Sequence, residues 1–244
     1  MTTSHSPFHY PILLVPGYWL GAWVWDAVVA RLTVLGFQTD AITLPGLESL
    51  DAPRAGVRFA DHVDAVTDRI RALGTPVVLV AHSGAGAVAS AVADQLPESL
   101  ARTIYVDSGP VADGTVPRPD LLPEDTDLPF PGLDALAAQG ISTAGIAAPD
   151  RARLASLAVP QPAGACREPV VLRDPRRNLV PVSLVCCSFP SDAVRGMVAS
   201  GVEMFAAVAE LADVTWVDLP TGHWPMLSRP IDLADVIARE ADRT

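Results

Sequence analysis

The chain has 244 residues and a formal net charge of −11, and half of its residues are apolar. This length and composition suit one α/β domain with a large core. The acidic charge argues against nucleic acid or an anionic membrane as the partner. All seventeen cationic residues are arginine, which excludes a Schiff-base lysine, a pyridoxal-phosphate lysine and a phosphate-loop lysine.

Short β-branched runs alternate with longer helical patterns along the chain, which is typical of a mainly parallel sheet covered by helices on both faces. The predicted strands of this α/β fold are residues 10–15, 38–44, 76–81, 103–107, 182–187 and 215–219. The predicted helices are residues 23–32, 59–73, 85–96, 192–211 and 231–239.

One long stretch interrupts this alternation. Residues 110–190 hold 13 of the 23 prolines, and two short helical patterns, 133–139 and 150–157, lie between proline-rich loops. The stretch contains too many apolar residues for a disordered linker. We therefore predict that residues 110–181 form a cap inserted into a core made of residues 1–109 and 182–244.

The cysteines and histidines show no metal-ligand spacing. Cys166, Cys186 and Cys187 form no CxxC pair, and the last two lie in an apolar run typical of a core. We expect no metal and no other cofactor.

Residues 1–7 contain no basic region followed by an apolar stretch, and no apolar run approaches membrane-spanning length. The sequence thus favours a cytoplasmic protein without a membrane partner.

Ser83 lies between an apolar run at 77–80 and a series of small helix formers. This is the pattern of a strand–nucleophile–helix turn, in which small residues at 81 and 85 allow the backbone to turn sharply and expose the serine oxygen. A serine that merely caps a helix after a strand fits the short pattern equally well. Other residues of the chain are therefore needed to distinguish a nucleophilic serine from a helix-capping serine.

His223 is the candidate base that a serine nucleophile needs. It follows the predicted strand 215–219, on a loop that contains Gly222 and Trp224, directly before the last helix. Active-site groups of open α/β sheets gather at the carboxyl ends of the strands, so His223 and Ser83 are expected at the same edge. The alternative is an ordinary histidine on a surface loop.

With Ser83 and His223 in these positions, the chain resembles proteins of the α/β-hydrolase fold, in the compact branch that includes small esterases, plant methyl esterases and hydroxynitrile lyases. The resemblance implies a mainly parallel sheet with a cap inserted after the sixth strand of the family. Where the family usually has His-Gly, this chain has Pro16-Gly17, and Ala81 stands where the family has glycine. The resemblance depends on LLVPGYWLGAWVW at 13–25, LPG at 44–46, VAHSGAG at 80–86 and GHWP at 222–225.

The resemblance also implies an oxyanion hole and a binding pocket. The backbone N–H groups of Tyr18 and Gly84 would hold the developing negative charge, because such donors are fixed before the reaction begins. A simple turn after a strand is the alternative for Pro16-Gly17. Trp19 and Trp224 are expected to form walls of the substrate pocket. The neighbouring His82 is expected to pack the turn at Ser83 rather than to react.

The acid of the predicted triad has two candidates. Most of the family carries it after the strand 182–187, but that position holds Ser188 or Phe189, and Asp192 comes late enough to belong to the next helix. Asp107 ends the strand 103–107, where haloalkane dehalogenases and some lactonases of this fold place their acid. Many relatives have a non-catalytic aspartate there. We favour Asp107, keep Asp192 as the alternative acid, and leave open that neither serves.

The predicted function is therefore a cofactor-free serine hydrolase of the carboxylesterase or lactonase type. It would act through an acyl-enzyme on a small neutral, lipophilic ester or lactone. One alternative is a non-hydrolytic lyase of the same fold, although hydroxynitrile lyases of this group rely on a lysine that the chain lacks. The other is a ligand-binding protein of the same fold with vestigial chemistry. The oligomeric state stays open.

Overall fold

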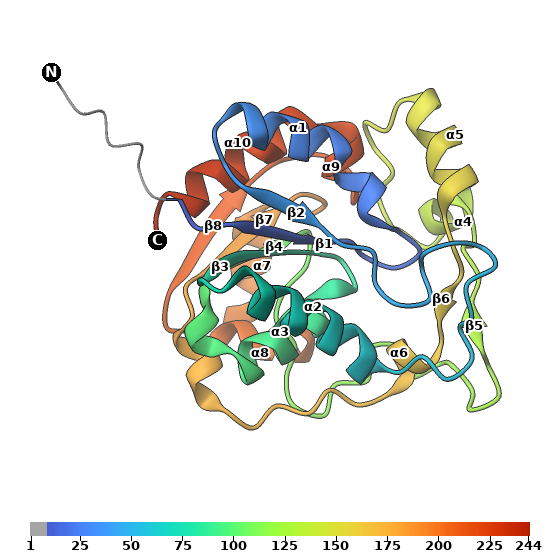
Figure 1. Cartoon of the computed structure of the whole chain (residues 1–244), viewed down its shortest axis with the longest axis horizontal. Coiled ribbons are helices and arrows are strands. Elements are labelled where there is room, and N and C mark those ends of the chain that lie inside the picture. Colours follow the sequence, from blue (N-terminus) through green and yellow to red (C-terminus); the bar gives the residue numbers. More distant parts are fainter. Residues whose placement is uncertain (1–8) are drawn as a thin grey trace, which may run out of the picture.

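A six-stranded sheet lies at the centre of the molecule (Figure 1). The computed structural model describes residues 9–244, and the prediction made for residues 1–7 lies outside this range. All strand pairs of the sheet are parallel, in the order β2-β1-β3-β4-β7-β8, so the predicted parallel sheet is confirmed. The strands are β1 (Ile12–Val15), β2 (Thr39–Ala41), β3 (Val77–His82), β4 (Leu100–Val106), β7 (Val182–Cys186) and β8 (Val214–Asp218).

Helices cover both faces of the sheet because alternate strand residues are apolar on each side. In β1, Ile12 and Leu14 belong to one buried cluster, and Leu13 and Val15 belong to the other. The first cluster includes η1 (Ala22–Trp25), α1 (Asp26–Val34), α9 (Pro225–Ser228) and α10 (Pro230–Ala241). The second includes α2 (Phe59–Leu73), α3 (Ala85–Gln95) and α8 (Ala206–Ala209), with α7 (Ser191–Ala199) packed beside it.

The chain between β4 and β7, called the inserted segment below, consists of short elements, of which β5, β6, α4 and α5 lie at the right of Figure 1. Their apolar side chains are continuous with the core, since Leu133, Leu136 and Leu154 are buried in the same cluster as α1 and α10. The elements are the antiparallel pair β5 (Asp127–Leu128) and β6 (Gln161–Pro162), α4 (Leu133–Ala138), α5 (Ala148–Leu157), α6 (Gly164–Arg167) and η3 (Pro175–Leu179).

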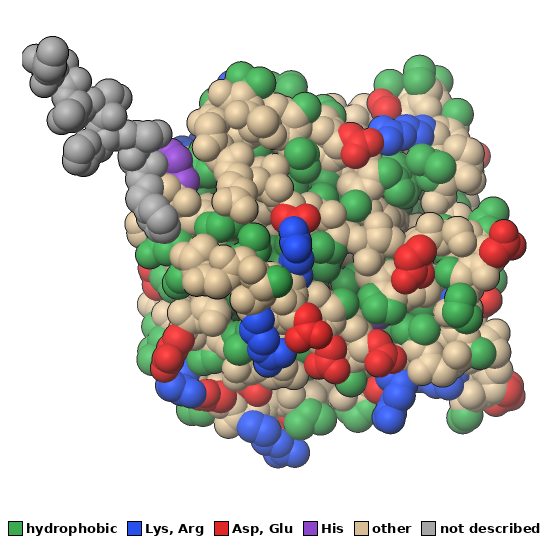
Figure 2. Space-filling view, viewed as in Figure 1, with side chains coloured by type: hydrophobic (Ala, Val, Ile, Leu, Met, Phe, Trp, Pro, Cys, Tyr) green, Lys and Arg blue, Asp and Glu red, His purple; other side chains and the backbone are tan. Residues whose placement is uncertain are grey.

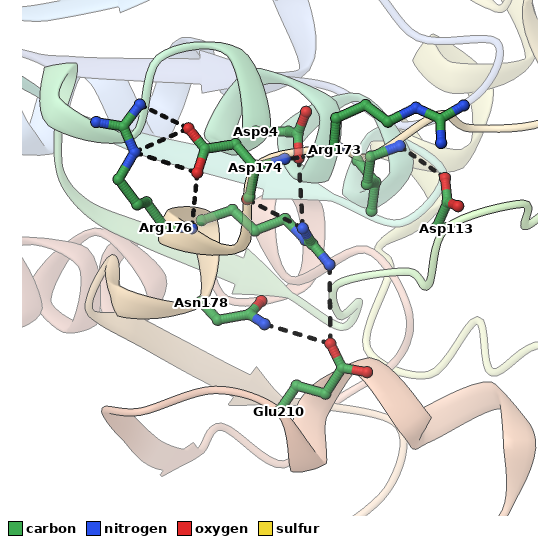
Figure 3. Close-up of polar contacts among 9 residues, drawn as sticks. Asp94, Asp113, Arg173, Asp174, Arg176, Asn178 and Glu210 are labelled. Carbon is green, nitrogen blue, oxygen red and sulfur yellow. Dashed lines mark hydrogen bonds and ion pairs between the residues drawn. The ribbon is translucent and has the colours of Figure 1, made fainter.

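A polar network fastens the end of this inserted segment to the core (Figure 3). The Asp94 carboxylate, on α3, accepts hydrogen bonds from the backbone N–H groups of Arg173 and Asp174, at 2.8 and 2.7 Å. It also pairs with Arg177, whose guanidinium reaches Glu210 beyond α8. Asp94 and Arg177 together therefore join three separate parts of the chain.

Arginine and acidic side chains alternate over the face of the molecule drawn in Figure 2. Most arginines of the described chain have an acidic partner, for example Arg31 with Asp235 at 2.8 Å. Between residues 9 and 244, no helix is both long and apolar enough to cross a bilayer.

The predicted helix 192–211 is wrong. The chain instead forms α7, the short helix η4 (Glu203–Phe205) and α8, and the break falls at Gly201, whose φ is +70°. A left-handed residue ends a helix, and glycine takes this conformation without a steric penalty. The remaining short helix, η2 (Pro97–Ser99), follows α3 where Pro97 stops it.

Candidate active site

Ser83 lies on the tight turn between β3 and α3, with a φ of +51°. Such a left-handed backbone is uncommon for serine and persists only when its surroundings hold it. The Ser83 N–H donates to the Val106 carbonyl at 3.3 Å, and the Ser83 carbonyl accepts from the Ser108 hydroxyl at 2.6 Å. A Cβ atom at Gly17 would come within 2.9 Å of the Ser83 Cβ, so glycine is required where the two loops meet.

The structure brings Ser83, His223 and Asp107 together in one hydrogen-bonded row. His223 Nε2 lies 2.7 Å from the Ser83 hydroxyl oxygen, and His223 Nδ1 lies 2.6 Å from Asp107 Oδ2. His223 comes from the loop after β8, and Asp107 directly follows β4. Asp192, the alternative acid, is exposed in the first turn of α7. The hydrogen bond of His223 Nδ1 is made with Asp107 and not with Asp192.

The Asp107 carboxylate is also held by the chain that follows β7. Oδ1 accepts from the N–H groups of Cys187 and Ser188, at 3.1 and 2.8 Å, and Oδ2 accepts from the Ser188 hydroxyl at 2.6 Å. Burial alone would raise the pKa of Asp107. The hydrogen bond and charge of His223, together with both Ser188 bonds, outweigh burial and lower that pKa to about 2. Asp107 is therefore ionised at neutral pH.

The backbone of His223 is fixed from two sides. Its N–H donates to the Ser142 carbonyl of the inserted segment, and its carbonyl accepts from His82 Nε2, both at 2.7 Å. Burial, and then the nearby His223, lower the pKa of His82 to about 3, so His82 is neutral and carries its proton on Nε2. The Trp224 ring is buried and packs edge-on against the His223 ring, at 4.9 Å between centroids.

The predicted oxyanion donors, Tyr18 and Gly84, lie on two loops in close contact. A Cβ atom at Gly84 would overlap the Tyr18 ring, so the glycine permits this packing. Among residues 9–244, neither the Tyr18 N–H nor the Gly84 N–H donates to a protein acceptor. Two such amides beside a nucleophile are what a developing oxyanion needs.

Trp19 connects the Tyr18 loop to the inserted segment. Its N–H donates to Gln161 Oε1 at 3.2 Å, its carbonyl accepts from the Val159 N–H at 2.9 Å, and its indole N–H donates to the Leu128 carbonyl at 3.0 Å. Phe130 packs edge-on against its ring at 5.5 Å. Trp19 is half-buried, with a φ of +67°. Within the described chain, Trp19, Ser83 and Asp107 are the only non-glycine residues with a positive φ, and all three lie here.

Sequence reasoning missed three residues of this site. Ser188 had a signal, because the position where most of the resembled family carries its acid holds Ser188 or Phe189. Ser142 and Gln161 had none, since Ser142 lies in irregular chain and Gln161 in the two-residue strand β6, which has no recognisable pattern. Between residues 9 and 244, no cluster of three or more His, Cys, Asp or Glu side chains is arranged to hold a metal ion. The site is suited to nucleophilic acyl transfer.

Comparison with known proteins identifies the architecture. A family model described as "Alpha/beta hydrolase family" matches residues 12–236, whereas no curated protein matches the sequence. Similar solved structures include an Arabidopsis methylesterase (18% identity, TM-score 0.74, 96% of this chain and 100% of that chain covered). A pyrethroid hydrolase from Sphingobium faniae JZ-2 is 22% identical (TM-score 0.68, 96% and 97% covered). A variant of tomato methylketone synthase I complexed with beta-ketoheptanoate is 17% identical (TM-score 0.73, 97% and 99% covered).

Proposed function

The chain belongs to the alpha/beta hydrolase family, and from this premise we propose that it is a cofactor-free serine hydrolase of the carboxylesterase or lactonase type. The observation that carries the proposal is the unbroken row from the Ser83 hydroxyl through His223 to Asp107, with contacts of 2.7 and 2.6 Å. A nucleophile, a base within hydrogen-bond reach and a group that orients the base are the parts that acyl transfer requires.

In the proposed reaction, His223 Nε2 takes the proton of Ser83 as the serine oxygen attacks the ester carbonyl. Asp107 keeps the His223 ring in the required tautomer and stabilises its cationic form. The Tyr18 and Gly84 N–H groups hold the oxyanion. His223 then donates its proton to the leaving alcohol, which leaves an acyl group on Ser83. A water molecule, deprotonated by His223, releases this acyl group as the acid.

A small neutral, lipophilic ester or lactone is the proposed substrate class. The Trp224 ring, packed against His223, and the paired rings of Trp19 and Phe130 next to Tyr18 support it, as does the net charge of −11, which disfavours anionic substrates. Residues 110–181 are the proposed cap of this pocket. Two similar structures bear the names methylesterase and pyrethroid hydrolase, which agree with ester hydrolysis. The proposal includes a cytoplasmic location and no nucleic-acid partner.

A non-hydrolytic reaction is the second candidate, because one similar structure is named a methylketone synthase. Such an enzyme would use Ser83 and His223 to bind a substrate and move its proton. The absence of lysine argues against the hydroxynitrile-lyase version. The complete row of Ser83, His223 and Asp107 argues against a vestigial binding protein.

Fluorophosphonate labelling and ester turnover test the proposal together. The wild type is expected to label at Ser83 and to hydrolyse short p-nitrophenyl esters or lactones, whereas Ser83→Ala loses both activities. Ser200→Ala, which changes an exposed serine on the loop after α7, is the control and retains both. Equal turnover by wild type and Ser83→Ala would overturn the proposal. Labelling without ester or lactone turnover would favour the non-hydrolytic candidate.

A further inference from the structure

We propose that Gln161, in the inserted segment, is a positioning residue for the oxyanion hole, because its side-chain amide holds the turn that presents the Tyr18 N–H. The inference rests on the proposed function, which assigns the Tyr18 N–H to the oxyanion. It adds that a residue 142 positions further along the chain than Trp19 keeps this donor in place.

The turn is formed by residues 17–20. The Leu20 N–H donates to the Gly17 carbonyl at 3.4 Å, which is a long bond, and Trp19 is the third residue of the turn, with a φ of +67°. Tyr18, the second residue, has no positive φ. This combination defines a type II turn, whose third position normally requires glycine or asparagine. A tryptophan there is unfavourable unless contacts outside the turn hold it.

Gln161 supplies the contact that selects this turn. Type I and type II turns differ by a flip of the central peptide, which here joins Tyr18 to Trp19. The N–H of that peptide donates to Gln161 Oε1 at 3.2 Å. Without the acceptor the N–H would be left unpaired, and the turn would relax toward type I, with Trp19 outside the left-handed region. The flip changes ψ of Tyr18 and φ of Trp19, and so disturbs the loop that carries the Tyr18 N–H and holds the Tyr18 ring against Gly84.

The Gln161 side chain is itself fixed. It is 2% exposed and lines the same small cavity as Tyr18 and Gly84. The Tyr18 ring lies against Gly84. Gln161 is therefore buried beside both proposed oxyanion donors. Since a buried amide loses little freedom on holding its partner, Gln161 is suited to keep the donors in place before substrate binds.

Three variants test this role by steady-state kinetics with a p-nitrophenyl ester. Gln161→Met removes the acceptor at nearly constant size, and we expect kcat to fall about 10- to 100-fold while KM changes less than about twofold. Gln161→Glu retains an acceptor for the Trp19 N–H and should keep the turn, but its buried carboxylate opposes the oxyanion, so kcat is expected to fall while the Trp19 N–H stays protected. Gln161→Asn, one methylene shorter, is the milder variant should Gln161→Met not fold. Inhibition by a trifluoromethyl ketone, which forms an oxyanion on the serine, should weaken in parallel with kcat/KM.

The matched control is Ser90→Ala. Ser90 is 3% exposed and accepts a hydrogen bond from the Val111 N–H at 3.1 Å, so it too joins the core to the inserted segment, but away from the Tyr18 loop. Its loss should lower the melting temperature and leave kcat unchanged. A Gln161→Met variant with wild-type kcat, or with a changed KM alone, would overturn the inference.

Amide hydrogen exchange at Trp19 separates this inference from the proposed function. The Trp19 N–H should be protected in the wild type and exchange faster in Gln161→Met and Gln161→Asn, whether or not the ester is a substrate. Unchanged exchange would overturn the positioning role. A wild type that neither labels nor hydrolyses esters would overturn the proposed function instead, and with it the oxyanion assignment.

Discussion

At the scale of single residues, the Asp107 carboxylate carries four hydrogen bonds, one from His223 and three from Cys187 and Ser188. The position where most of the resembled family carries its acid holds Ser188 or Phe189. Here the chain after β7 instead holds, by hydrogen bonds, the carboxylate that follows the neighbouring strand β4.

Asp107→Asn tests which carboxylate orients His223. The amide has no charge to stabilise the cationic ring and favours the wrong tautomer, so kcat should fall by about 10³- to 10⁴-fold with a smaller change in KM. Asp192→Asn, on the exposed first turn of α7, is the matched control and should retain wild-type rates. Steady-state kinetics with one ester would decide. The reverse ranking of the two variants would assign the acid to Asp192.

Ser188→Ala tests the support given to Asp107. Because the pKa of Asp107 is lowered to about 2, its ionised form stabilises the fold above about pH 4, and this contribution disappears as the pH falls toward 2. Removing the Ser188 hydroxyl raises that pKa and lowers the free energy of unfolding by about 2 kcal/mol at pH 7. Urea unfolding at a series of pH values should show the two stabilities converge below pH 4. A difference that is independent of pH would contradict this account.

At the scale of elements, the local pattern predicted some helices and failed for others. Residues 59–73 form α2 as predicted, because an apolar stripe at helical spacing ends at Gly74, whose φ is +68°. Along 192–211 the apolar pattern continues past Gly201, where the helix ends. The pattern did not predict this end, because the sequence around a glycine does not show whether its φ is positive. β2 is also shorter than predicted, as expected for an edge strand with one partner.

Local motifs predicted Ser83 and His223, which have sequence patterns of their own. Asp107 was favoured over Asp192 from its place at the end of a predicted strand, but its contact with His223 spans 116 positions and depends on strand order, which no spacing encodes. Gln161, in the two-residue strand β6, and Ser142, in irregular chain, lie in segments without periodicity. Long-range hydrogen bonds of this kind arise from the tertiary fold alone.

Helix α10 is held to the sheet by a buried carboxylate. Glu240 is fully buried and accepts from the Ser183 hydroxyl at 3.0 Å, and this hydroxyl in turn accepts from the Arg102 guanidinium at 3.1 Å. Glu240→Ala would remove the acceptor of the Ser183 hydroxyl and one of the two carboxylates whose charge acts on buried Arg102, the other being Asp213, and should lower the free energy of unfolding by about 3 kcal/mol. Asp235→Ala, which breaks a half-exposed pair with Arg31 on the same helix, should lower it by less than about 1 kcal/mol. Urea unfolding measures both, and similar losses would contradict the proposed anchoring.

At the scale of the whole molecule, the inserted segment and the sheet share one interior. Leu136 and Leu154 of the segment are buried with Ile12 of β1 in a single cluster. Polar contacts join the two parts as well, at Asp94 (Figure 3) and around Trp19. Because His223 and the Tyr18 loop are both hydrogen-bonded to this segment, opening it as a rigid lid would disturb the proposed site itself.

The shared interior predicts one cooperative unfolding transition. Loss of ester hydrolysis, of tryptophan fluorescence and of helical circular dichroism should coincide along a urea titration. Asp94→Ala should shift all three curves together, by about 2 kcal/mol, because it unpairs two backbone N–H groups and Arg177 at a carboxylate that is 10% exposed. Glu98→Ala, which breaks an exposed pair with Arg176, is the control and should shift them by less than about 1 kcal/mol. Loss of activity and fluorescence at clearly lower urea concentrations than loss of helical structure would mean that the inserted segment unfolds independently. That result would contradict a single cooperative unit.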